Sequence, residues 1–191
     1  TRDSISLDKY LTDISKISIL TADEEVELAI KIKQGDTAAL DKLISSNLRF
    51  VVSVAKQYQN NGLSLSDLIN EGNVGLMKAA KRFDETKGFK FISYAVWWIR
   101  QSIIQAIVEY SRMVRVPSNK MSKLSRVMEA FTSFVQQFER DPSMEELAEV
   151  CELSEAEVTI IWNGRKNYAS VDAPIGGDES DLTMLDMMPN D

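Results

Sequence analysis

Apolar residues recur at every third or fourth position along most of this 191-residue chain, the spacing that lines one face of an α-helix. No stretch alternates apolar and polar residues for long enough to predict a sheet. Only four prolines and eight glycines interrupt the pattern. Helices are predicted over residues 4–18, 21–34, 37–60, 64–83, 91–112, 118–138, 143–151 and 154–165. The predicted fold class is therefore all-α.

Capping residues, prolines and glycines mark where these helices begin and end, and they divide the helices into two units. Thr21, followed three residues later by Glu24, predicts a capping box. Pro117 ends the first unit, because the residue before a proline resists helical backbone angles. The last stretch contains Gly176-Gly177 and many acids, which is typical of a linker. We predict a helical domain over 1–115, a small three-helix domain over 116–168, and an extended acidic linker over 169–191.

Two glycines lie inside one predicted helix, at positions 72 and 75. Each costs roughly 1 kcal/mol relative to alanine in a helix interior. Gly72 and Gly75 therefore predict that something approaches the backbone of this helix closely.

The chain has no histidine, and Cys151 is its only cysteine. These absences exclude Ser-His and Cys-His nucleophile pairs, zinc sites built on those residues, and disulfides within the chain. An enzyme acting through Asp or Glu stays open, although no paired carboxylates in an apolar setting stand out. We predict a protein that is not an enzyme and holds no cofactor or metal ion. No apolar run approaches the ~18 residues of a membrane span, so we expect a cytoplasmic protein.

Charge is distributed unevenly, although the whole chain carries a net charge of −7. Residues 1–77 carry a net −3 and residues 127–191 a net −12, whereas residues 78–126 hold eleven Lys and Arg against three Asp and Glu. The local field decides where a polyanion docks, so the basic segment 78–126 is the candidate nucleic-acid site. The alternative is an ordinary solvated face.

Aromatic rings gather inside the basic segment. They are Phe83, Phe89, Phe91, Tyr94, Trp97 and Trp98, with Tyr110 further along the chain. The cations between and around them are Lys78, Lys81, Arg82, Lys87, Lys90 and Arg100. On a helix, positions 94, 97, 98 and 101 form one continuous stripe.

Two interpretations of this stripe stay open. Aromatic residues at helical spacing are usually core. Rings framed by cations also suit unpaired bases, which stack at roughly 1–3 kcal/mol each while the cations hold the backbone. The adjacent Trp97 and Trp98 cannot both point inward, which favours the second interpretation. Two or three stacked bases would offset the few kcal/mol needed to remove a base from a duplex.

Residues 141–165 have the pattern of a helix-turn-helix unit, whose usual role is recognition of the major groove. Glu155 and Glu157 would begin its second helix, where phosphate and base contacts normally lie, and the next cation is Arg165. We therefore predict a structural or protein-binding role for this unit. The acids beyond it are either a solvated tail or a nucleic-acid mimic that occupies a basic channel.

Four runs of sequence, at 46–52, 62–84, 88–103 and 112–117, carry a family resemblance. Over essentially its whole length the chain resembles the primary-type sigma factors of bacterial RNA polymerase, without their C-terminal domain that binds the minus-thirty-five element. The resemblance implies binding to the clamp helices of core RNA polymerase and recognition of the minus-ten promoter element. It also implies that the chain melts DNA by capturing flipped bases of the non-template strand, which starts transcription.

The resemblance implies a role for several groups of residues. Contacts with core polymerase are expected from Asp67, Asn70, Glu71, Asn73 and Met77, with Gly72 and Gly75 allowing close approach. Minus-ten recognition and melting are expected from Phe83, Lys87, Phe89, Lys90, Phe91, Tyr94, Trp97, Trp98, Arg100 and Gln101. A downstream-base pocket is expected from Glu25, Asn47, Arg49 and Phe50, discriminator contacts from Tyr10 and Leu11, and upstream backbone contacts from Arg112, Arg115 and Lys120. An acidic finger is expected at Asp178, Glu179, Asp181 and Asp186.

Within the minus-ten group, Tyr94 is expected to hold a flipped adenine, and Trp97 and Trp98 to form a wedge where the duplex ends. The rival from another class is a helical adaptor or anti-factor whose aromatic rings are all core. The promoters chosen, the regulators and the oligomeric state stay open.

Overall fold

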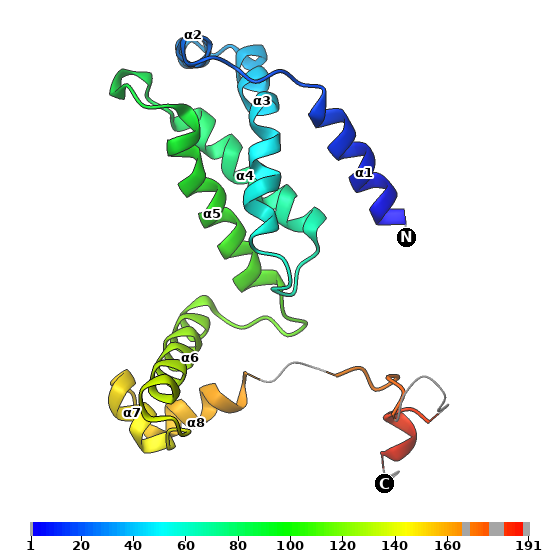
Figure 1. Ribbon diagram of the computed structural model, residues 1–191, viewed down its shortest axis with the longest axis vertical. Coiled ribbons are helices and arrows are strands. Elements are labelled where there is room, and N and C mark those ends of the chain that lie inside the picture. Colours follow the sequence, from blue (N-terminus) through cyan, green and yellow to red (C-terminus); the bar gives the residue numbers. More distant parts are fainter. Residues whose placement is uncertain (1, 166–168, 176–181, 189–191) are drawn as a thin grey trace. The chain divides into compact units, whose positions relative to one another are not determined.

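The computed structural model describes residues 2–165, 169–175 and 182–188, with the backbone alone for residues 2–4. The chain forms two compact units, Thr1–Val116 and Pro117–Asp191 (Figure 1). The described residues are helical apart from turns, loops and one isolated antiparallel bridge, which confirms the all-α fold class. In the described part of the chain, no helix combines the length and the apolar character needed to cross a bilayer.

Side-chain caps set the starts of three helices in the first unit. The helices are α1 (Arg2–Ser15), α2 (Ala22–Lys33), α3 (Thr37–Lys56), α4 (Leu65–Arg82) and α5 (Phe91–Tyr110). Thr21 and Glu24 form the predicted capping box at α2. Asp36 caps α3, and Ser64 caps α4. These caps pair N–H groups that the first turn of a helix leaves without an intrahelical partner.

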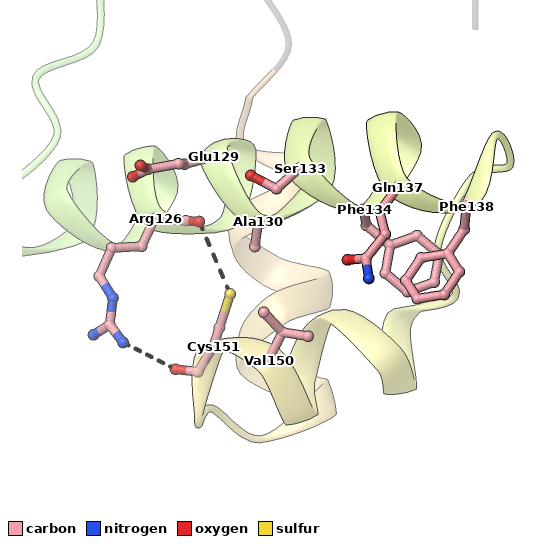
Figure 2. A pocket seen from close by; sticks show the side chains of 9 residues that line it. All are labelled: Arg126, Glu129, Ala130, Ser133, Phe134, Gln137, Phe138, Val150 and Cys151. Atoms are coloured by element: carbon pink, nitrogen blue, oxygen red, sulfur yellow. Dashed lines mark hydrogen bonds between the residues drawn. The ribbon is translucent and has the colours of Figure 1, made fainter.

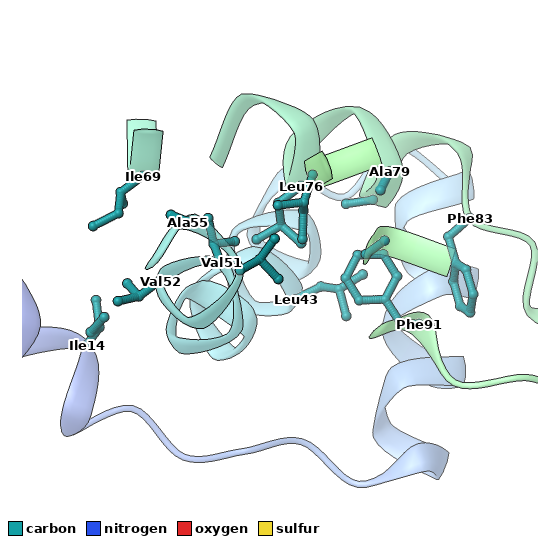
Figure 3. Close-up of a cluster of buried hydrophobic side chains, with 14 of the residues drawn as sticks. Ile14, Leu43, Val51, Val52, Ala55, Ile69, Leu76, Ala79, Phe83 and Phe91 are labelled. Atoms are coloured by element: carbon teal, nitrogen blue, oxygen red, sulfur yellow. The ribbon is translucent and has the colours of Figure 1, made fainter. Parts of the chain in front are cut away.

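The core of the first unit lies between α3, α4 and α5 (Figure 3). Leu43, Val51, Leu76 and Phe91 are fully buried there, and Ile14 of α1 packs against the same cluster. Fully burying one such side chain contributes about 1.5–3 kcal/mol. This core fixes α4 against α5. The rings predicted to bind bases lie on α5 and in the turn that joins the two helices.

The two helical glycines allow neighbouring elements of this unit to touch. A Cβ at Gly75 would lie 2.5 Å from the carbonyl oxygen of Trp98, and one at Gly72 would lie 2.6 Å from Cγ1 of Val51. Both glycines are buried. The predicted close approach is therefore real, but the expectation that it serves a partner protein is wrong, because α5 and α3 occupy the space.

Several helices end earlier than the sequence predicts, among them α1, which stops at Ser15 instead of residue 18. α3 stops at Lys56 instead of Asn60, because the turn into α4 uses left-handed backbone at Asn60 and Gly62, with φ of 67° and 87°. α5 stops at Tyr110, two residues early.

The second unit contains α6 (Ser118–Phe138), α7 (Met144–Cys151) and α8 (Glu155–Asn163). Its core is formed by Val127, Leu147, Ala148, Cys151 and Val158. Lys123 of α6 pairs with Glu157 of α8 at 3.1 Å. Glu157, one of the two acids that begin the second helix of the helix-turn-helix pattern, therefore forms an ion pair within the unit.

Cys151 is a packing residue of this second unit. It borders a hollow of about 470 Å³ between α6 and α7, beside Phe134, Phe138 and Val150 (Figure 2). Its thiol donates to the carbonyl of Arg126 at 4.0 Å, and its own carbonyl accepts from the Arg126 guanidinium at 3.3 Å. Burial raises the pKa of the thiol, which keeps it protonated at neutral pH.

Parts of the predicted acidic linker pair with each other. Ile175 N–H donates to the Leu182 carbonyl at 2.8 Å, and Pro174 and Thr183 form the antiparallel bridge. The Asp186 carboxylate accepts from Thr183 N–H, which lowers the pKa of Asp186. The other expected finger acids, Asp178, Glu179 and Asp181, lie outside the described residues.

Candidate nucleic-acid interface

A tight turn between α4 and α5 supports the candidate interface. The turn contains a short 3₁₀ helix, η1 (Glu85–Lys87), which Asp84 caps by accepting from Thr86 N–H. Gly88 closes it with φ of 72°, a left-handed conformation that suits glycine. α5 then begins at Phe91, whose N–H donates to the Glu25 carboxylate of α2 at 3.0 Å.

Four rings contact one another around Phe83. The centroid of Phe83 lies 5.2 Å from that of Phe91, 6.1 Å from Tyr94 and 6.5 Å from Phe89. Tyr94 in turn lies 6.2 Å from Trp98. These are edge or tilted contacts within the range that aromatic pairs favour, so the rings hold one another in place.

The predicted stripe on α5 lies at the boundary between the core and the solvent. Trp97 is 69% exposed, and Gln101 is exposed beside it. Tyr94 and Trp98 are half-buried and pack against the core. The stripe is thus partly buried against the core and partly exposed to solvent. We call Tyr94, Trp97, Trp98 and Gln101 the outer face of α5. Core residues support its rings on one side, and the other side is open to solvent.

Two of the phenylalanines that were expected to bind DNA are buried. Phe91 is completely buried and Phe83 is 6% exposed. Phe91 is enclosed by the core, whereas Phe83 lines a small pocket, and both rings support their aromatic neighbours. Their contacts with bases stay a prediction. Phe89, Lys87 and Lys90 are exposed, and Arg100 is half-buried.

Five cations of the basic segment form no ion pair in the described part of the chain. They are Lys78, Lys81, Lys87, Lys90 and Arg100. The guanidinium of Arg82 lies 4.8 Å above the ring of Trp98, a cation–π contact that orients the ring. The sequence places Arg82 among the cations of this segment, but nothing in the spacing shows that α4 brings it onto a ring sixteen positions later.

Each acid of the basic segment forms an ion pair. Lys33, at the end of α2, pairs with both Asp84 and Glu85, and Arg115 lies 3.8 Å from Glu109. The hydrogen bond from Lys33 lowers the pKa of Glu85, and hydrogen bonds from Thr86 and then Lys33 lower the pKa of Asp84. The same carboxylates raise the pKa of Lys33, so all three groups are charged at neutral pH.

α4 carries most of the expected polymerase contacts on an accessible face. Asp67, Asn70 and Met77 are exposed, and Glu71 is half-buried. Asn73 departs from this group: its Nδ2 donates to the hydroxyl of Tyr10 at 3.2 Å. The roles expected for Asn73 toward polymerase and for Tyr10 toward the discriminator stay predictions, and within the chain their polar groups bind each other.

The four residues of the expected downstream-base pocket each make contacts within the chain, and their shared role stays a prediction. Asn47 is buried, and its amide donates to the Leu43 carbonyl within α3. Arg49 donates to the Ile17 carbonyl at 3.2 Å. Phe50 and the discriminator residue Leu11 pack against the core. Glu25 instead borders a small pocket of about 110 Å³ whose lining includes Phe83, Phe89 and Lys90.

The expected upstream cations are spread over both units. Arg115 is 71% exposed and forms the ion pair with Glu109 given above. Arg112 is half-buried in the first unit, and Lys120 is exposed at the start of α6 in the second.

Three family models match the chain in consecutive blocks. Sigma-70 factor, region 1.2 matches residues 6–38, Sigma-70 region 2 matches residues 43–113, and Sigma-70 region 3 matches residues 122–191. The chain belongs to the sigma-70 family. The region 2 match contains α4, α5 and the turn between them, and thus the whole outer face of α5.

Curated relatives of this sigma-70 chain include three proteins named RNA polymerase sigma factor SigA. The chain is 40% identical to that of Clostridium acetobutylicum over 182 residues, which are 95% of this chain and 48% of the relative. It is 43% identical to those of Listeria monocytogenes and Listeria innocua over 170 residues, which are 89% of this chain and 46% of each relative. The chain spans about half the length of the curated relatives it matches.

Proposed function

We propose that this chain is a transcription initiation factor that binds bacterial core RNA polymerase and recognises the minus-ten promoter element. In this proposal it melts DNA by taking unpaired bases of the non-template strand onto the outer face of α5, and it acts in the bacterial cytoplasm. The observation that carries the proposal is the 69% exposure of Trp97 between the half-buried rings of Tyr94 and Trp98. The printed name of the relatives, RNA polymerase sigma factor, supports it.

Physical chemistry explains why this face suits single strands. A base in a duplex is already stacked, whereas a flipped base exposes both of its faces. Each ring that takes up a base contributes about 1–3 kcal/mol, and unpaired Lys and Arg side chains attract the strand that carries it. Binding energy alone can therefore hold the opened strand, and no chemical step by this chain is needed.

The rival function, a helical adaptor with a purely structural aromatic core, is disfavoured by the same observation. Such a protein has no reason to leave Trp97 open to solvent beside free cations. A contiguous exposed apolar patch marks an interaction site, and Trp97 adjoins the partly exposed rings of Tyr94 and Trp98 on one helix face.

Core polymerase binding is expected to depend on the exposed face of α4. Replacing Asn70 or Glu71 with alanine should weaken the affinity for core polymerase by about five- to thirtyfold, the effect of losing one central interface residue worth 1–2 kcal/mol. The measurement is a titration of labelled chain with core enzyme. Glu27→Ala, which removes an exposed acid from α2, is the matched control.

Two results would argue against this assignment. Wild-type affinity in both the Asn70→Ala and Glu71→Ala variants would remove α4 as the docking face. Failure of core polymerase to capture the wild-type chain at all would remove the proposed function.

A further inference from the structure

Lys33 reaches the candidate interface from a different part of the chain. Asp84 and Glu85 are the only acids between positions 78 and 101. The Nζ of Lys33 lies 3.2 Å from Oδ1 of Asp84 and 2.7 Å from Oε2 of Glu85. The Glu85 side chain is only 12% exposed, so water contributes little to balancing its charge. Lys33 is the cation that does so.

A second contact from α2 supports the same turn. The Glu25 carboxylate accepts the N–H of Phe91 at 3.0 Å, at the point where Lys90 provides no side-chain cap for α5. Glu25 and Lys33 lie two turns apart on one helix. α2 therefore holds the turn of residues 83–90 at both ends, and this turn carries Lys87, Phe89 and Lys90.

We propose that Lys33 is a positioning residue for DNA capture: its positive charge offsets part of the negative charge of Asp84 and Glu85 and so keeps the surface beside the outer face of α5 attractive to a polyanion. The inference rests on the proposed function. Without Lys33, two uncompensated carboxylates would stand on the turn that presents Lys87 and Lys90. Their repulsion of a strand extends over a Debye length of about 10 Å at 0.1 M salt. Lys33 thus acts through the two acids and needs no contact with DNA.

The test measures binding of a labelled, single-stranded TATAAT oligonucleotide to the complex of the chain with core polymerase. Lys33→Ala is expected to weaken binding about fivefold at 0.05 M salt, with most of the difference lost at 0.5 M, because salt screens charge repulsion. Lys31→Ala is the matched control, since it removes an equal charge from the same helix at an exposed position outside the ion pairs given above. Lys31→Ala should bind within twofold of the wild type.

Rescue variants separate neutralisation from the other roles that Lys33 could have. Lys33→Arg, which keeps the charge, should restore binding. Lys33→Ala combined with Asp84→Asn and Glu85→Gln should restore it too, because both uncompensated charges are gone. A lysine that contacts phosphate directly, or that only braces the fold, would leave this triple variant as weak as Lys33→Ala.

The outcomes distinguish this inference from the proposed function. If the wild-type complex binds the oligonucleotide but Lys33→Ala matches Lys31→Ala, or the triple variant stays weak, the inference about Lys33 is overturned and the proposed function stands. If the wild-type complex does not bind the oligonucleotide, both are overturned. Fivefold loss with rescue by both variants supports both.

Discussion

Tyr94→Ala is expected to weaken binding of a single-stranded minus-ten oligonucleotide to the chain–polymerase complex by about five- to hundredfold, without changing the affinity for core polymerase. The ring of Tyr94 is held between Phe83 and Trp98 at centroid distances of 6.1 and 6.2 Å. A ring fixed in this way loses little freedom when a base stacks on it, and one stacked base is worth roughly 1–3 kcal/mol. Fluorescence anisotropy of the labelled oligonucleotide measures the effect.

Two variants control for the loss of the ring at position 94. Tyr94→Phe keeps the stacking surface and should retain most of the affinity. Tyr110→Ala removes another exposed tyrosine from the far end of α5 and should have little effect. Parallel loss of polymerase binding and oligonucleotide binding in Tyr94→Ala would refute the separation of the two roles. Undiminished oligonucleotide binding would remove Tyr94 from the capture site.

Gly75→Ala is expected to lower the free energy of unfolding of the first unit by about 3 kcal/mol or more. Alanine favours a helix by roughly 1 kcal/mol over glycine, which works in the opposite direction. At this position the added Cβ would stand 2.5 Å from the carbonyl oxygen of Trp98 and 2.9 Å from Cα of Ile99. Backbone cannot rotate away as a side chain can, so α4 and α5 must separate and open the core between them. Urea unfolding followed by circular dichroism measures the change.

Gly72→Ala provides the informative comparison, because its obstacle is a side chain. The added Cβ would meet Cγ1 of Val51 at 2.6 Å. Combining Gly72→Ala with Val51→Ala should therefore cost clearly less than the two single changes added together, since the clash disappears in the double variant. No such partner exists for Gly75. A Gly75→Ala chain as stable as the wild type would show that α4 and α5 do not pack as closely as described.

Local sequence signals predicted the elements of this fold well. The capping box of Thr21 and Glu24, the helical spacing of the core positions and the break at Pro117 each depend on residues close together in the chain. Helix ends were less accurate where the turn required left-handed backbone at Asn60, a residue type that also occurs inside helices. Gly72 and Gly75 signalled a close approach, but one sequence cannot say which surface approaches.

Contacts between distant residues could not be predicted in the same way. The bonds Tyr10–Asn73 and Glu25–Phe91 join residues more than sixty positions apart. Helical spacing placed Phe91 near the stripe of Tyr94 and Trp98, yet position 91 faces the core and position 97 faces the solvent. The sequence therefore located the aromatic and basic segment, whereas the division into supporting and exposed rings required the packing of α4 against α5.

The ion pairs of Lys33 and Arg115 explain how an acidic chain can hold a basic surface. The three acids of residues 78–126 are each paired, and the cations near Trp97 are left for other partners. This arrangement depends on Lys33 of α2, whose place beside Asp84 and Glu85 cannot be predicted from the spacing of the sequence.

The most direct test of base capture is photocrosslinking of the chain–polymerase complex to a non-template TATAAT oligonucleotide with 5-iodouracil in place of its thymines. Trypsin cleaves after Lys90 and Arg100, so the peptide of residues 91–100 isolates Tyr94, Trp97 and Trp98 from the rest of the chain. The account predicts that mass spectrometry finds the adduct on this peptide. An oligonucleotide that binds the complex but crosslinks only to residues 141–165, or to no part of α5, would contradict it.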